Sequence, residues 1–236
     1  MILRKAIRKI KRIFWELNGT PNLIKREIKI PAKWFGNLYG GFYVHPILNQ
    51  SSIVYSFGVG EDISFDLGLI DKYNCQIFAF DPTPKSINWI SDRRLPTNFK
   101  FFPYGIHSET GYVIFNLPKN KDFVSGSIIR QQNVDPGNCI QVQMKCLDDI
   151  IRDLQHTEID ILKIDIEGSE YEVLDDILNS NVKINQILIE IHERYFVDGR
   201  KKTQELLSKL RDKRYYLFAI SDTFEELSFI KFDNQI

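Results

Sequence analysis

The chain has 236 residues, 43% hydrophobic and 13% aromatic, which excludes an intrinsically disordered protein and provides for one sizeable core. Its 31 basic and 31 acidic residues balance, so the overall charge gives no reason to expect a nucleic-acid partner. The three cysteines include no Cys-x-x-Cys pair, which argues against a disulfide framework and against a zinc site.

The first expected element is a basic amphipathic helix within residues 1–18. Residues 1–33 hold ten Lys or Arg against two acids, which leaves 21 basic and 29 acidic residues for the rest of the chain. We expect the helix either to lie on an anionic membrane surface or to pack its apolar side on protein. No apolar run suits a membrane span or a signal peptide, so we expect a cytoplasmic protein, which is peripheral at the membrane only if residues 2–17 bind the membrane surface. The apolar side consists of Leu3, Ile7, Ile10, Phe14 and Leu17.

Residues 19–50 are expected to form an irregular, aromatic-rich arm before the main domain. Five aromatic residues are interspersed with three glycines, and no helical or strand period is evident. The arm could fold over a site as a lid that excludes water, or its rings could pack in the core. The aromatic residues are Trp34, Phe35, Tyr39, Phe42 and Tyr43.

Residues 51–236 alternate between strand and helix patterns. This alternation predicts an α/β domain with a mostly parallel sheet, and the last two strands have no helix between them, which predicts a closing hairpin. A polar loop is expected at Asp135-Pro136-Gly137. Strands are expected at 53–57, 76–80, 99–102, 112–117, 140–146, 159–164, 186–191, 215–220 and 227–232, and helices at 63–73, 84–94, 147–154, 169–178 and 202–213.

The first strand of this domain runs into a glycine loop. Gly58 and Gly60 allow a close backbone approach at a strand-to-helix turn, and Asp81 follows Gly58 by 23 residues, a spacing typical of a ribose-binding carboxylate. Ile63 stands where a dinucleotide fingerprint has its third glycine, and the loop acids would repel a pyrophosphate. These features favour S-adenosylmethionine, which has no phosphate and carries a cationic amine and a sulfonium.

A second motif, Lys163-Ile164-Asp165-Ile166-Glu167-Gly168, lies within the stretch 159–174. Together with Leu147-Asp148-Asp149-Ile150 before it and 186–192 after it, the motif resembles the FkbM-type branch of class I S-adenosylmethionine-dependent methyltransferases. The resemblance covers roughly residues 50–195. It implies a Rossmann-like fold of seven strands with helices on both faces, S-adenosylmethionine as cofactor, and O-methylation of a hydroxyl on a sugar, glycan or other small molecule.

The predicted cofactor site combines the glycine loop, the end of the second strand and the start of the second motif. Class I enzymes usually carry an acid where Ser56 stands. We therefore expect Glu61 or Asp62 to contact the methionine amino group, or Ser56 to accept a weaker hydrogen bond. The predicted cofactor-binding residues are Ser56, Phe57, Gly58, Gly60, Glu61, Asp62, Asp81, Pro82, Gly105, Ile106 and Asp165.

The predicted catalytic residues are Asp165, Glu167 and His192. Asp165 ends a central strand beside the point where α/β folds bind ligands, and histidine is the natural general base near neutral pH. Glu167 is equally explained as an acid near a helix start, and His192 as a surface residue. We predict no metal, although these three residues with Glu190 offer ligands that suit Mg²⁺ or Mn²⁺. Lys163 is expected on the opposite face of the sheet, in a structural ion pair.

Two other functions stay open at this point. An NAD-dependent oxidoreductase would use the same strand, glycine loop and acid, although the missing third glycine argues against it. A non-catalytic, membrane-associated binding module would explain Ser56 as a degraded site and the basic helix as an anchor.

Overall fold

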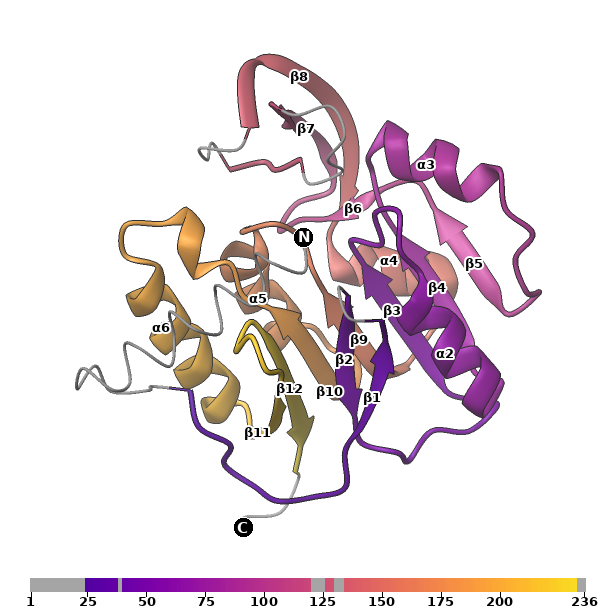
Figure 1. Cartoon of the computed structure of the whole chain (residues 1–236), viewed down its shortest axis with the longest axis vertical. Coiled ribbons are helices and arrows are strands. Elements are labelled where there is room, and N and C mark those ends of the chain that lie inside the picture. Colours follow the sequence, from indigo (N-terminus) through magenta and orange to yellow (C-terminus); the bar gives the residue numbers. More distant parts are fainter. Residues whose placement is uncertain (1–23, 38–39, 120–125, 130–133, 233–236) are drawn as a thin grey trace.

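The computed structural model describes residues 24–37, 40–119, 126–129 and 134–232 (Figure 1). Seven strands form the central sheet in the order β11-β12-β10-β9-β3-β4-β5. All neighbours pair in parallel except β12, which is antiparallel to both β10 and β11. The predicted seven-stranded Rossmann-like sheet with its closing hairpin is therefore confirmed. The strands are β3 (Ile53–Phe57), β4 (Gln76–Phe80), β5 (Phe99–Phe102), β9 (Glu158–Ile164), β10 (Lys183–Glu190), β11 (Tyr215–Ile220) and β12 (Glu226–Lys231).

Helices cover both faces of this sheet (Figure 1). Side chains of the central strands alternate between two cores, so that Leu162 of β9 enters one and Ile161 the other. This two-sided burial explains why β9 reads as a continuous apolar run. The first core receives α4 (Leu147–Leu154), α5 (Glu170–Asn179) and α6 (Gly199–Asp212); the second receives α2 (Ser64–Tyr73) and α3 (Pro84–Ser91).

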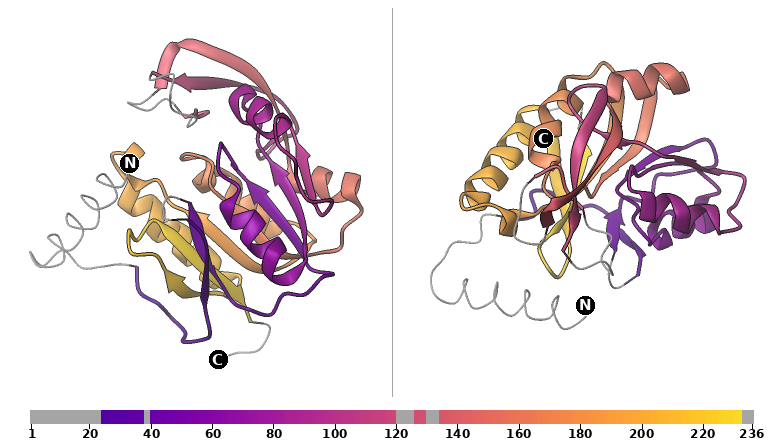
Figure 2. Two further views of the ribbon diagram at one scale, coloured as in Figure 1. Left: turned by 45° about the vertical axis from the view of Figure 1, so that its right-hand side comes forward. Right: turned by 90° about the horizontal axis from the view of Figure 1, so that it is seen from above.

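A second, three-stranded sheet projects from one end of the molecule (Figures 1 and 2). Its order is β6-β8-β7, with β6 (Gly105–Ile106), β7 (Gly111–Pro118) and β8 (Val134–Lys145). The predicted strands at 112–117 and 140–146 are present, but they pair with each other outside the main sheet. The predicted polar loop at 135–137 is wrong, because this segment lies within β8, where it forms an irregularity at which the register of the β7–β8 ladder shifts.

The arm before the main domain is more regular than expected. β1 (Lys33–Gly36) and β2 (Gly41–Val44) form an antiparallel hairpin, so the prediction of an irregular arm is wrong there. Gly36 has φ +102, and a Cβ on it would come within 2.2 Å of the Gly40 carbonyl oxygen. The glycines thus permit a tight turn, and Phe35 and Phe42 pack in the second core rather than as a lid.

The predicted helix of residues 1–18 and Tyr39 lie outside the described residues. Among the residues that are described, no helix is long and apolar enough to cross a membrane. Membrane contact through residues 2–17 therefore stays a prediction.

Candidate active site

The two sequence motifs meet at the carboxyl ends of β3 and β9, where the strand connections of the sheet diverge in opposite directions. The amide of Asp165 donates to the Phe57 carbonyl at 3.1 Å, and the amide of Gly58 donates to the Phe80 carbonyl at 2.9 Å. Gly58 has φ +75, and a Cβ there would lie 1.7 Å from the Asp165 carbonyl oxygen. The close approach that requires glycine at position 58 is therefore made by the protein's own backbone, which joins the glycine loop to the second motif.

Asp81 fixes the glycine loop from the end of β4. Its Oδ2 accepts a hydrogen bond from the Gly60 amide at 2.9 Å, and its Oδ1 accepts from the Thr83 amide at 2.9 Å and the Thr83 hydroxyl at 2.6 Å. The side chain is 4% exposed. The predicted pairing of glycine loop and acid is present, and the acid is held in place by the fold itself.

The remaining predicted cofactor residues divide into core and edge. Phe57 stacks on Phe80 with ring centroids 4.5 Å apart, and Ile106 is buried in the same core, so their side chains do not face a site at the edge. Glu61 forms an ion pair with Lys85 at 3.4 Å. The other positions lie at the strand ends. Asp62 accepts hydrogen bonds from the Ser64 amide and from the Asn37 side chain, which follows β1. A Cβ on Gly105 would lie 3.2 Å from Pro82, so these two residues are in close contact.

A carboxylate from α2 lies beside Ser56, the position where class I enzymes usually carry an acid. Asp66 of α2 is buried beside the Ser56 hydroxyl, where burial raises its pKa to about 6 although the Lys163 ammonium lowers it. Lys163 Nζ donates to the Gly58 carbonyl at 2.9 Å, and its charge also lowers the pKa of Asp165. We expected Lys163 in a structural ion pair on the opposite face of the sheet, but its Nζ donates to the Phe57 and Gly58 carbonyls at the carboxyl end of β3.

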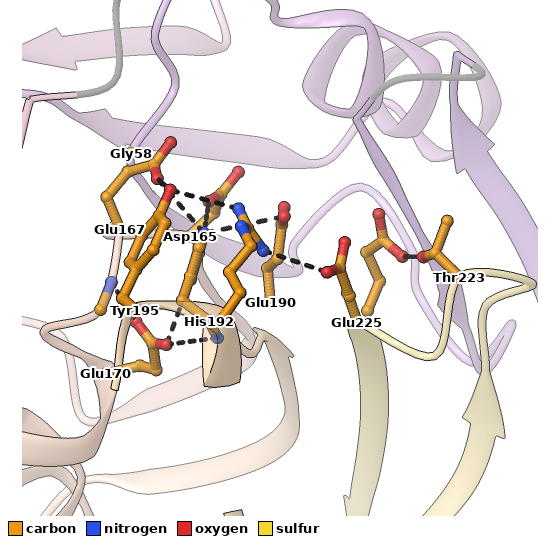
Figure 3. Close-up of polar contacts among 12 residues, drawn as sticks. Gly58, Asp165, Glu167, Glu170, Glu190, His192, Tyr195, Thr223 and Glu225 are labelled. Atoms are coloured by element: carbon orange, nitrogen blue, oxygen red, sulfur yellow. Dashed lines mark hydrogen bonds and ion pairs between the residues drawn. The ribbon is translucent and has the colours of Figure 1, made fainter. Parts of the chain in front are cut away.

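Four side chains, which we call the acid–histidine cluster, converge beyond β9 and β10: Asp165, Glu167, Glu190 and His192 (Figure 3). His192 Nε2 lies 3.4 Å from Glu167 Oε2, 3.7 Å from Glu190 Oε1 and 3.9 Å from Asp165 Oδ1. Within the described part of the chain, this buried nitrogen has no hydrogen-bond partner. The structure therefore brings all three predicted catalytic residues together and adds Glu190, which the sequence offered only as a metal ligand.

Glu170 orients His192 from the opposite side. Its Oε1 accepts from the His192 amide at 2.9 Å and lies 3.1 Å from His192 Nδ1, while its Oε2 accepts from the Gly168 amide at 2.9 Å. Both side chains are fully buried. The alternative of a surface histidine is wrong, because the loop after β10 folds inward over the start of α5.

Burial and mutual repulsion dominate the electrostatics of this cluster. Burial opposes a charge on His192, but the carboxylates of Glu170, Glu167 and Glu190 outweigh it and raise the pKa to about 10. Burial raises the pKa of Asp165, and burial together with Asp165 raises the pKa of Glu190 well above its usual range. These carboxylates favour the protonated form of His192 while no metal ion is bound, so we look for the proton acceptor among the carboxylates.

The loop that carries Glu167 is strained and held by contacts that are distant in sequence. Glu167 has φ +53, in the left-handed region that non-glycine residues rarely adopt. Tyr195 donates to Glu167 Oε2 at 2.5 Å, and Ser127, next to the small sheet, donates to the Glu167 carbonyl at 2.8 Å. Sequence reasoning missed both residues. Tyr195 follows His192 by three positions and was within reach of a local argument, whereas nothing in the sequence connects Ser127 to this loop.

Two solved structures align with most of the chain. A crystal structure of a putative transferase from Pyrococcus horikoshii matches at 8% identity and a TM-score of 0.37, covering 94% of this chain and 81% of that one. The structure of M. jannaschii TYW2 in complex with AdoMet matches at 11% identity and a TM-score of 0.32, covering 87% and 89%. Both TM-scores are below 0.5, so the fold assignment rests on the strand order given above.

Curated relatives give a more specific likeness. The chain is 24% identical over 206 residues to human probable methyltransferase-like protein 24, covering 80% of this chain and 48% of that protein. It is 23% identical over 141 residues to the hexuronic acid methyltransferase AglP of Haloferax volcanii, covering 56% of each. The chain thus spans about half the length of the curated relatives it matches.

The family model described as methyltransferase FkbM domain matches residues 54–217, which is more than half of the sequence. The predicted family is confirmed, and the chain belongs to the FkbM methyltransferases.

Proposed function

We propose that this protein is an S-adenosylmethionine-dependent methyltransferase that methylates a hydroxyl group. The observation that carries the proposal is the contact between Gly58 and Asp165, which sets a glycine loop and an acid–histidine cluster side by side at the carboxyl edge of the sheet. Ligands of open α/β sheets bind at this edge. The family membership supports methyl transfer as the reaction.

The glycine loop and Asp81 form the proposed cofactor side. Asp81 stands at the tip of the neighbouring strand, where a carboxylate can accept hydrogen bonds from both ribose hydroxyls. Its present partners, the amide of Gly60 and the amide and hydroxyl of Thr83, hold it at that position before a ligand arrives. Asp62 and Glu61 add negative charge on the loop, which favours a cationic cofactor over a pyrophosphate.

The acid–histidine cluster forms the proposed acceptor side. Methyl transfer makes a carbon–oxygen bond as the sulfonium carbon–sulfur bond breaks, and the hydroxyl proton passes to a carboxylate of the cluster. Asp165 is our choice for this acceptor, because its raised pKa brings it nearer the operating pH and it adjoins Gly58. His192, which Glu170 holds in place, then positions the carboxylates.

The acceptor we propose is a sugar or glycan hydroxyl. A cluster of three carboxylates and one imidazole offers several hydrogen-bond acceptors, which suits a molecule with several hydroxyl groups. The curated description of AglP as a hexuronic acid methyltransferase agrees with this choice. Family membership argues against the NAD-dependent oxidoreductase that the glycine loop left open.

The proposal is tested in two steps. Calorimetry should show saturable binding of S-adenosylhomocysteine and none of NADH. Radiolabelled S-adenosylmethionine should then transfer its methyl group to a member of a panel of monosaccharides, uronic acids and lipid-linked glycans. Binding of NADH without S-adenosylhomocysteine would overturn the cofactor assignment. Cofactor binding without transfer to any panel member would favour the non-catalytic module.

A further inference from the structure

We propose that the acid–histidine cluster binds one divalent cation, with Mn²⁺ preferred over Mg²⁺. Asp165, Glu190 and His192 supply the ligand atoms, and Glu167 closes the cluster on the fourth side. The binding of the ion stands on the geometry of these residues, whereas the role we give it rests on the proposed methyl transfer.

The ligand atoms have the spacing that a shared ion requires. One oxygen each of Asp165 and Glu190 and one nitrogen of His192 all lie within 4.8 Å of one another. Ligands held at about 2.0–2.2 Å from an ion stand roughly 3–4.4 Å apart. The distances of 3.4 to 3.9 Å from His192 Nε2 to the three carboxylates are in this range, and all but the shortest exceed the limit for a hydrogen bond.

His192 Nε2 points into the cluster without a partner of its own. It is one of the few buried polar atoms without a hydrogen bond among the described residues. Its other ring nitrogen, Nδ1, lies 3.1 Å from Glu170 Oε1, so a proton on Nδ1 leaves the Nε2 lone pair directed at the carboxylates. Metal-binding histidines are commonly arranged in this way, with the second nitrogen donating to a carboxylate. Glu170 is therefore a positioning residue behind the site.

The charge of the cluster also calls for a cation. Three carboxylates face one imidazole (Figure 3). Lys163 and Arg194 also lie near these carboxylates, but Lys163 Nζ donates to the Gly58 carbonyl at 2.9 Å and Arg194 pairs with Glu225 at 3.1 Å. A divalent ion at the centre would offset the repulsion that remains.

The ligand set decides the class of ion. Carboxylates suit hard cations, and a single imidazole favours Mn²⁺ over Mg²⁺ in the usual order of divalent affinities. Ca²⁺ needs six to eight oxygen ligands, more than this cluster supplies. The side chains of Asp165, Glu167 and Glu190 are 25%, 21% and 13% exposed, so the ion has coordination positions open to a substrate.

The open coordination positions of the ion indicate the chemical class of the methyl acceptor. A bound cation would lower the pKa of a hydroxyl that coordinates it, and the hydroxyl proton would pass to a carboxylate of the cluster, which leaves an alkoxide as the nucleophile for methyl transfer. An acceptor whose reactive hydroxyl has a second oxygen within chelating distance would occupy two such positions at once. Vicinal diols and α-hydroxy acids, including sugars and uronic acids, are of this class.

The test is direct titration of chelator-treated, full-length protein with Mn²⁺ alone, followed by electron paramagnetic resonance. We expect one Mn²⁺ per chain. Asp165→Asn, Glu190→Gln and His192→Gln should each weaken its binding by at least 10-fold. Glu172→Gln, an exposed acid on the same helix as Glu170, is the matched control and should bind like the wild type. Circular dichroism identifies any variant that has lost its fold.

The outcomes are separable from those of the proposed function. Folded wild-type protein without saturable Mn²⁺ binding overturns the site, and so does a Glu190→Gln variant that binds Mn²⁺ as well as Glu172→Gln. S-adenosylhomocysteine binding is measured on the same samples. If the wild type binds Mn²⁺ but not S-adenosylhomocysteine, the methyltransferase proposal is refuted and the metal site stands. If it binds S-adenosylhomocysteine but not Mn²⁺, only the metal site is refuted.

Discussion

The two halves of the carboxyl edge, the glycine loop with Asp81 and the acid–histidine cluster, differ in how far their polar groups are hydrogen-bonded within the protein. On the cofactor side, both oxygens of Asp81 are bonded to backbone or hydroxyl groups, and Gly60 is held in place. In the acid–histidine cluster, His192 Nε2 has no hydrogen bond among the described residues, and the pKa values of Asp165 and Glu190 are raised. The glycine loop and Asp81 are therefore preorganised by the fold alone, whereas the acid–histidine cluster keeps a polar atom and carboxylates that a ligand or a cation could bind.

This difference predicts different consequences of substitution. Changes on the cofactor side should lower affinity and leave the fold intact, since the loop is also held by backbone contacts. Changes in the cluster should lower turnover or stability, since its charges depend on one another.

The largest expected effect is on turnover. Asp165→Asn should reduce methyl transfer by about 10²–10⁴-fold, the range for loss of a general base. Asp176→Asn, an exposed acid of α5, is the control and should retain full activity. A fully active Asp165→Asn variant would remove the distinction between the two halves, because the acceptor side would then need no carboxylate there.

His192→Ala should destabilise the protein by roughly 3–5 kcal/mol, because it leaves the buried Glu170 carboxylate without its cationic partner. Urea unfolding in the presence of a chelator measures the loss. Combining His192→Ala with Glu170→Gln should recover part of it, since the uncompensated charge is then gone. An unchanged free energy of unfolding in His192→Ala would show that the pair has no structural role.

Asp66, which is buried beside Ser56 at the base of the glycine loop, provides a prediction on the pH dependence of stability. Its pKa is raised from 3.8 to about 6 in the folded protein, so its contribution to stability is fully present below pH 3.8 and is lost as pH rises through 6. Asp66→Asn should therefore gain stability over the wild type between pH 4 and pH 8, by up to about 3 kcal/mol. Urea unfolding across this range checks it, with the exposed Asp71→Asn of the same helix as control. A difference that does not vary with pH would contradict the raised pKa.

On the cofactor side, Asp81→Ala should weaken S-adenosylhomocysteine binding by about 1.5–3 kcal/mol, the scale of hydrogen bonds to a charged group. Calorimetry measures the change, and the exposed Asp71→Ala should bind normally. Equal affinities of Asp81→Ala and the wild type would mean that Asp81 only supports the loop.

The smallest effect that we expect from a single residue is on membrane binding, which follows from the contrast between the basic segment 1–33 and the acidic remainder of the chain. We propose that residues 2–17 lie on anionic membranes, with each basic residue contributing about 1 kcal/mol near the surface. Co-sedimentation with anionic vesicles should fade at high salt and disappear when residues 1–18 are deleted. Equal sedimentation of the full-length and truncated proteins would reject the proposal, which would also remove the reason for expecting a peripheral location.

The order of strands and helices was readable from the sequence, because apolar periodicity and capping are local. β4 and α4 occur at the predicted residues, and Thr83 caps α3 just ahead of Pro84 by accepting from the Ser86 amide. The motif at 163–168 and its counterpart at 186–192 predicted the family and the convergence of Asp165 with His192.

Tertiary structure decided what those residues are able to do. The burial of His192, its partnership with Glu170 and its raised pKa arise from loops that meet only in the folded chain. The burial of Asp66 beside Ser56, and the contact of Ser127 with Glu167 across 40 residues of sequence, likewise arise only when the chain folds. Local patterns specify backbone conformation, whereas burial and charge depend on every group that packing brings near.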